Sequence, residues 1–127
     1  MTIRNFFEIN KLPKYLQENT INTIEYFNHK GQLIKRGFPE IYQDAVNAGK
    51  KLHVLGLKKG STAVIMGKTS YYWLVAEIAC IFAGIRTIAM PENYSEAQIR
   101  ECLAPYKVDV LFPDAELVSL LAPFKCP

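Results

Sequence analysis

The sequence lacks most of the short patterns that mark catalytic and cofactor-binding sites. It contains no Gly-x-Gly-x-x-Gly, no Gly-x-Ser-x-Gly, no His-Glu-x-x-His and no EF-hand loop. These absences argue against four kinds of site: a dinucleotide site, an α/β-hydrolase nucleophile, a zinc-protease helix and a calcium-binding loop. The sequence also has no large excess of one charge, since its formal charge is +3 and its lysines and arginines are scattered. It therefore lacks the clustered basic residues typical of nucleic-acid-binding proteins.

Cysteine is sparse and is not arranged for cross-linking or metal binding. The three cysteines, Cys80, Cys102 and Cys126, are an odd number, are widely spaced and form no Cys-x-x-Cys pair. This pattern fits neither a disulfide framework nor a zinc site. Cys80 falls within an apolar stretch and is interpreted as a small buried hydrophobe. With only two histidines in addition, the sequence predicts no metal-ligating residues.

Targeting and membrane signals are weak. The first 20 residues contain no continuous apolar segment, so we expect no secretory signal and a cytoplasmic location. The longest apolar stretch, Trp73 to Met90, has 18 residues, near the lower limit for crossing a bilayer. Glu77, Arg86 and a break at Gly84 interrupt it, and charges inside a span are costly. The sequence therefore predicts no membrane span.

What the sequence does have is an apolar centre, Thr69 to Pro91. Its first part, Trp73 to Ala83, is long enough for a helix, with Thr69 or Ser70 able to cap its start. Gly84 follows where a left-handed cap ends such a helix, and Arg86 to Met90 is typical of a short buried strand. A helix that is apolar on most sides must be covered on most sides, so we place this segment at the middle of the fold.

The rest of the chain predicts further elements in a regular order. Residues 1–22 are expected to form an N-terminal arm, either a short helix or an arm that packs across a larger body, with Pro13 interrupting it. Residues 23–127 are expected to form a single α/β subdomain. A hairpin and an amphipathic helix come first; short strands and helices then alternate, which implies a parallel sheet with right-handed crossovers. The expected hairpin consists of the strands Thr23–Asn28 and Gln32–Arg36 around the turn His29-Lys30-Gly31. The helix that follows is expected from Phe38 to Gly56, and its apolar face consists of Ile41, Ala45, Ala48, Leu52 and Leu55. The later elements are expected to be the strand Thr62–Met66, a helix from the capping box at Ser95 to Pro105, the strand Val108–Phe112 and a helix Ala115–Ala122 capped by Asp114.

The loop after the strand Thr62–Met66 is a candidate phosphate site. Gly67-Lys68-Thr69-Ser70 resembles the end of a Walker A loop, but the full pattern needs a glycine where Thr62 stands. Helix capping by Thr69 or Ser70 explains the loop without a nucleotide, although a helix N-terminus can attract an anion.

The remaining polar residues have ordinary structural interpretations. Glu77 lies within the apolar helix, yet a position at the helix edge or pairing with a cation explains it better than catalysis. His29 is expected in a turn and His53 near a helix end. The lysine pairs Lys50–Lys51 and Lys58–Lys59 are interpreted as solvated surface. The sequence thus predicts no catalytic, cofactor-binding or metal residue within this chain.

The order of these elements resembles the beginning of the AMP-forming acyl-adenylating enzymes. This superfamily includes acyl-CoA synthetases, fatty acyl-AMP ligases and peptide-synthetase adenylation domains. The similarity lies in three ordered segments across roughly residues 20–115: GFPEIYQDAVNAGKKLHVLGLKKGSTAVIM, TSYYWLVAEIACIFAGIRTIAMP and YSEAQIRECLAPYKVDVLF. Ser61, Thr69 and Tyr72 depart from the family's usual aspartate, asparagine and glutamate, at positions that look structural.

The resemblance implies an incomplete ligase fold. Family members are about four times longer, and their phosphate-binding loop, ribose-binding aspartate and C-terminal lysine have no counterpart here. ATP and Mg²⁺ are implied for the full enzyme and none for this chain, together with a carboxylic acid substrate and a thiol acceptor. The partner implied for this chain is the remainder of the ligase or a complementary protein surface. Because activation needs electrostatic stabilisation of phosphoryl oxygens, we expect this chain to be inactive alone.

Two other interpretations remain open at this stage. The chain could be a stand-alone non-catalytic module that binds a protein partner or an acyl chain. It could also be an unrelated small α/β signalling or nucleotide-binding domain, although its incomplete phosphate motif weighs against that. The sequence does not indicate which acid a full enzyme would activate.

Overall fold

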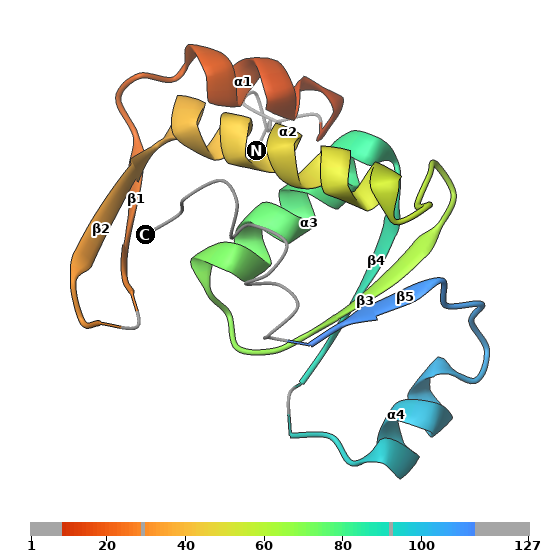
Figure 1. Cartoon of the computed structure of the whole chain (residues 1–127). Helices are drawn as coiled ribbons and strands as arrows, with labels where there is room; N and C mark the ends of the chain where they lie inside the picture. Colours follow the sequence, from red (N-terminus) through yellow and green to blue (C-terminus); the bar gives the residue numbers. More distant parts are fainter. Residues whose placement is uncertain (1–8, 29, 92, 114–127) are drawn as a thin grey trace, which may run out of the picture. The chain divides into compact units, whose positions relative to one another are not determined.

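The computed structural model describes residues 9–28, 30–91 and 93–113 (Figure 1). Helices and strands are mixed within these residues, as the sequence predicts. The chain divides into two compact units, the first ending at Gln43 and the second beginning at Asp44. Helix α2, Phe38–Val54, runs across that division. The predicted boundary at residues 22 and 23 stays a prediction.

The first unit contains a short helical segment and a β-hairpin. A 3₁₀ turn, Ile9–Lys11, leads into α1, Leu12–Glu18, followed by β1, Thr23–Phe27, and β2, Leu33–Gly37. Pro13 lies in the first turn of α1. The expectation that Pro13 interrupts the arm is therefore wrong, because a proline in the first turn removes an N–H that has no helical partner.

The hairpin forms with the predicted pairing. Strands β1 and β2 are antiparallel, with Thr23 opposite Gly37 and Phe27 opposite Leu33. The side chain of Asn28 accepts hydrogen bonds from the backbone N–H groups of Lys30 and Gln32, each at 2.9 Å. Gly31 takes φ +75°, which a glycine adopts without strain. The turn is thus held by one asparagine and one glycine.

Helix α2 has the predicted apolar face, except at its end. Ile41, Ala45, Ala48 and Leu52 are at most 1% exposed, whereas Leu55 is 60% exposed. The helix ends at Val54, so Leu55 no longer follows the helical period that would return it to the buried face. The prediction that Leu55 belongs to the apolar, core-facing side of the helix is therefore wrong.

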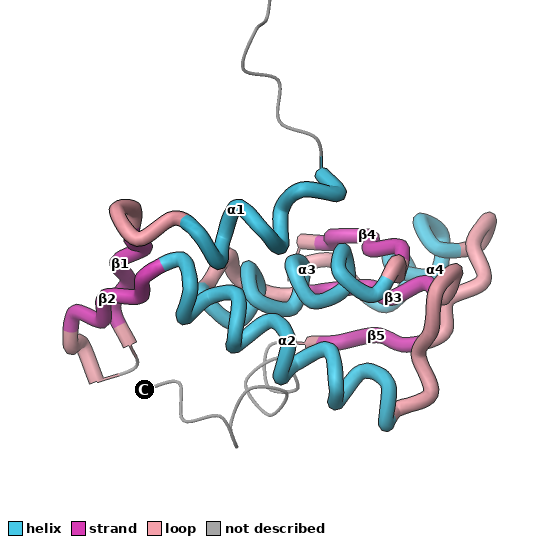
Figure 2. Tube along the Cα trace, turned by 90° about the horizontal axis from the view of Figure 1, so that it is seen from above, coloured by secondary structure: helices cyan, strands magenta, loops and turns pink. Residues whose placement is uncertain are grey.

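The second unit is built on a three-stranded parallel sheet. The strands are β3, Thr62–Met66, β4, Arg86–Met90, and β5, Val110–Phe112, in the order β4-β3-β5. Figure 2 shows β3 between the other two. Thr62 lies opposite Arg86, and Ala63 lies opposite both Thr87 and Val110. The predicted parallel sheet is confirmed, although β5 begins two residues later than expected.

Helices α3, Tyr71–Ala83, and α4, Glu96–Leu103, connect these strands. They lie on opposite sides of the sheet (Figure 1). This placement follows from the strand order. The crossover from β3 to β4 and the crossover from β4 to β5 run in opposite directions across the sheet, so right-handed connections put their helices on opposite faces. Both helix starts were predicted, including the capping box formed by Ser95 and Gln98. The predicted left-handed cap at Gly84 has φ +70°.

The core of this unit is centred on β3 and α3. Residues Thr62 to Ile65 of β3 are all buried. Strand β4 was predicted to be buried, but Arg86 and Ala89 are exposed and only Met90 is buried. The reason is its position, because β4 is an edge of the sheet in the part of the chain that the structure describes. The predicted helix Ala115–Ala122 and its cap Asp114 lie outside the described residues.

Candidate functional site

The carboxyl ends of parallel strands are where α/β sheets usually bind ligands, so the loop after β3 is the first candidate. It contains Gly67, with φ +152°, and Ser70, which is the N-cap of α3. The Ser70 hydroxyl accepts a hydrogen bond from the backbone N–H of Trp73 at 3.1 Å. The predicted capping role is therefore confirmed for Ser70. The same hydrogen bond occupies one of the donors that a bound anion would require.

Glu77 connects α3 to the sheet. Its carboxylate accepts a hydrogen bond from the Thr87 hydroxyl on β4, at 2.6 Å. Both side chains are half-buried. The bond satisfies a carboxylate within an otherwise apolar helix, which would be costly to leave unpaired. It supports the structural interpretation of Glu77 over a catalytic one.

Cys80 is one turn further along α3 and is 1% exposed. Burial, together with the smaller effect of the Glu77 charge, raises the pKa of its thiol to about 12. A thiol with such a pKa remains protonated at neutral pH and is a poor nucleophile. The prediction that Cys80 is a small buried hydrophobe is confirmed.

The other residues considered from sequence do not converge. His53 is exposed in the last turn of α2, and Lys50 is exposed one turn earlier. His29 lies outside the described residues. No group of three or more His, Cys, Asp or Glu side chains that could hold a metal ion occurs within residues 9–28, 30–91 and 93–113. No described helix is long and apolar enough to cross a membrane.

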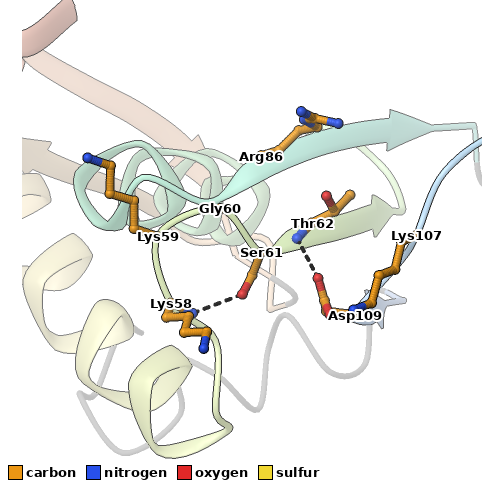
Figure 3. Close-up of a pocket in the computed structure, with 8 residues that line it drawn as sticks. All are labelled: Lys58, Lys59, Gly60, Ser61, Thr62, Arg86, Lys107 and Asp109. Carbon is orange, nitrogen blue, oxygen red and sulfur yellow. Dashed lines mark hydrogen bonds between the residues drawn. The ribbon is translucent and has the colours of Figure 1, made fainter.

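The amino ends of the same strands form a more polar site. A cavity of about 370 Å³ is lined there by Lys58, Lys59, Gly60, Ser61, Thr62, Arg86, Lys107 and Asp109 (Figure 3). Its four cationic side chains and one carboxylate leave three net positive charges. We call this the amino-edge pocket.

Backbone pairing fixes the floor of the amino-edge pocket. The Asp109 carboxylate accepts a hydrogen bond from the Thr62 N–H at 2.8 Å, and the Asp109 N–H donates to the Thr62 carbonyl at 2.9 Å. The Arg86 N–H donates to the Ser61 carbonyl at 2.8 Å. These bonds join the beginnings of all three strands, so the pocket is positioned by the sheet itself.

Sequence reasoning missed this pocket, because Lys58 and Lys59 were interpreted as solvated surface. A signal was nevertheless available. In a parallel sheet, the residues before each strand meet at one edge, and each of these three strands begins at or just after a cation: Lys58–Lys59, Arg86 and Lys107. The strand order was needed to see that these separate cations are neighbours.

Comparison with known proteins gives one family and one fold. The profile of a family described as AMP-binding enzyme matches residues 22–125. A mitochondrial medium-chain acyl-CoA ligase of Danio rerio, ACSF2, is 31% identical over 70 residues, which are 55% of this chain and 12% of that protein. The chain thus spans only a small part of this relative.

Solved structures share the fold at low sequence identity. The structure of McyG A-PCP complexed with phenylalanyl-adenylate superposes with a TM-score of 0.77 at 16% identity, covering 97% of this chain and 23% of that one. O-succinylbenzoate coenzyme A synthetase from Bacillus subtilis, in complex with AMP, gives 0.75 at 16% identity, covering 87% of this chain and 32% of that one. A structure from a study of fatty acyl-adenylate ligases of E. coli and L. pneumophila gives 0.71 at 19% identity, covering 94% and 23%.

Proposed function

The chain belongs to the AMP-binding enzyme family, and from this premise we propose that it is the N-terminal part of an ATP-dependent, AMP-forming ligase that activates a carboxylic acid. The complete enzyme would form an acyl-adenylate and usually pass the acyl group to a thiol. The observations that support this most directly are the family match over residues 22–125 and the coverage of only 23% and 32% of two solved structures that share the fold.

The part of the chain that the structure describes does not fit ATP or Mg²⁺ at the carboxyl edge of the sheet. The Gly67–Ser70 loop begins a helix whose cap is already supplied by Ser70. The described residues also contain no group of acidic side chains suited to a metal ion. We therefore derive no step of the reaction through these groups, and assign adenylate formation to the remainder of the ligase.

The role proposed for this chain is architectural. Strand β3 and helix α3 form a buried centre, and the hydrogen bond from Thr87 of β4 to Glu77 of α3 joins this helix to the sheet on which further parts of a ligase can assemble. The proposed partner is the rest of the ligase, and the proposed compartment is the cytoplasm. The identity of the acid and of the thiol acceptor belongs to that remainder.

A chimeric ligase tests this proposal. The segment of the Danio rerio relative that matches this chain over 70 residues is replaced by the aligned residues of this chain, and acid-dependent exchange of pyrophosphate into ATP is measured. We expect the chimera to retain exchange clearly above background, because the replaced segment supplies fold and not reacting groups.

A matched control carries Val64→Asp in the same chimera. Val64 is fully buried in β3, so a charge there should abolish folding and exchange together. A chimera that is folded by circular dichroism and monodisperse, yet has exchange no higher than the Val64→Asp control, contradicts the proposal.

A further inference from the structure

We propose that the amino-edge pocket binds a small phosphate-bearing polyanion of about diphosphate size. This site lies at the amino edge of the sheet, whereas ligands of open α/β sheets usually bind at the carboxyl edge. The proposal is independent of the ligase function, since it concerns only residues of this chain.

The first argument is that four cations from three separate segments line one cavity. Lys58 and Lys59 come from the turn before β3, Arg86 is the first residue of β4, and Lys107 comes from the segment before β5. All four side chains belong to exposed residues. Within the described residues, none of them forms an ion pair that would neutralise it. An anion in this cavity would therefore meet an excess of positive charge.

The second argument is that the framework is already satisfied without using these cations. The N–H groups of Gly60, Ser61, Thr62 and Arg86 donate to Gly84, Lys58, Asp109 and Ser61 respectively. The Lys58 N–H donates to the Ser61 hydroxyl oxygen at 3.0 Å. The pocket therefore differs from a phosphate loop, in which backbone N–H groups hold the ligand. Side-chain cations are its available donors.

Figure 3 shows how these groups are arranged. Arg86 and Lys107 lie on either side of Thr62 and Asp109, while Lys59 extends away on the other side of the turn. A Cβ at Gly84 would lie 3.0 Å from the Cγ of Lys59, so the lysine stem passes closely over this glycine. Asp109 is already engaged by the Thr62 N–H, which orients its carboxylate and leaves the cations to dominate the pocket.

The third argument concerns the class of anion. Three net positive charges favour a ligand with more than one negative charge over a single carboxylate. A cavity of about 370 Å³ suits a compact ligand, whereas an acidic peptide would need an extended groove. Arginine can bind phosphate oxygens through two N–H groups, and lysine acts as a point charge. A compact phosphate-bearing ligand meets all three conditions.

The test titrates inorganic pyrophosphate into the 127-residue chain at low ionic strength and follows backbone amide signals by NMR. We expect saturable shifts at residues 58–62, 86 and 107–109. The variant Lys58→Gln/Arg86→Gln/Lys107→Gln should weaken binding by about tenfold or more, because each removed charge weakens a Coulomb interaction. Raising the salt to physiological strength should weaken wild-type binding, since exposed charges are screened.

A charge-matched control is Lys30→Gln/Lys35→Gln/Lys50→Gln, which removes three exposed lysines outside the pocket. It should bind pyrophosphate within about twofold of wild type, apart from general screening. Equal weakening in both triple variants, or no saturable shift, overturns the proposal. So does binding of hexa-aspartate at these residues when pyrophosphate does not bind, because the pocket would then recognise an acidic peptide.

Discussion

Helices α3 and α4 flank the same sheet and begin in the same way, yet they differ in burial. Each starts at a serine whose hydroxyl accepts a backbone N–H three residues on. Helix α3 buries six of its 13 residues, and α4 buries none of its eight. Capping is therefore a local property that both sequences supply. Burial depends on what covers each side of the sheet, and the two sides are covered differently.

The strand register shows which apolar residues lie on the α4 side of the sheet. Thr87 reaches Glu77 of α3, so the alternation of side chains along β4 places Ile88 on the α4 side. Val64, Met66 and Leu111 share that side through the strand register. Val64 is fully buried, whereas Ile88, Met66 and Leu111 are half-buried. Ile88, Met66 and Leu111 thus give the α4 side of the sheet a partly exposed apolar surface. We expect the remainder of the enzyme to pack on the α4 side.

A matched pair of truncations tests this difference most strongly. Ile78 of α3 is 7% exposed, whereas Ile99 of α4 is half-buried. Ile78→Ala should lower the free energy of unfolding by about 3 kcal/mol, through lost burial and a new cavity. Ile99→Ala should lower it by less than about 1 kcal/mol. Urea unfolding of both variants measures the difference, and equal losses would show that α4 is as well packed as α3.

Cysteine alkylation compares the two helices without changing their packing. In a Cys126→Ser background at pH 8, exposed Cys102 of α4 should react with iodoacetamide at least about 100-fold faster than buried Cys80 of α3. Mass spectrometry of timed samples gives both rates. Comparable rates would mean that α3 opens as readily as α4.

The raised pKa of Cys80 also predicts a pH dependence. Its value of about 12 lies above the ordinary 9.0, so the unfolded thiol loses its proton first as pH rises. This contribution to stability is intact below about pH 9 and is lost progressively towards pH 12. Cys80→Ala should therefore reduce the alkaline loss of stability relative to wild type, measured by urea unfolding between pH 8 and about 10.5. An unchanged slope would contradict the assigned pKa.

The bond between Glu77 and Thr87 should contribute less than core burial. Thr87→Val keeps the shape of the side chain but removes the hydroxyl donor, and should cost about 1–2 kcal/mol. In a double-mutant cycle with Glu77→Gln, the two losses should be non-additive. Additive losses would indicate that the two groups do not interact in solution.

The smallest expected effect concerns the two serine caps. Ser70→Ala and Ser95→Ala each remove one cap, with a cost of about 1 kcal/mol where the helix belongs to the cooperative core. We expect Ser70→Ala to lower global stability, and Ser95→Ala mainly to increase amide hydrogen exchange within α4. A global loss from Ser95→Ala similar to that from Ser70→Ala would place α4 in the core.

Local signals in the sequence predicted much of this fold. Ser70, Gly84 and the Ser95–Gln98 box mark helix ends through short-range hydrogen bonds and backbone preferences, and the structure confirms them. The predictions that were wrong depend on context. Leu55 is exposed because α2 ends one residue before it, and Ala89 is exposed because its strand is at an edge. The amino-edge pocket was missed for the same reason, since it brings together residues as far apart as Lys58 and Asp109.

The central claim is that this chain carries the architecture of a ligase without its activation chemistry. The most direct measurement is pyrophosphate exchange into ATP by the 127-residue chain, with Mg²⁺ and a panel of carboxylic acids. We expect no acid-dependent exchange, because Ser70 already caps the helix at the carboxyl edge of the sheet, and the described residues contain no group of three or more His, Cys, Asp or Glu side chains that could hold a metal ion. Exchange that depends on one acid and is lost in the Val64→Asp variant would contradict the claim.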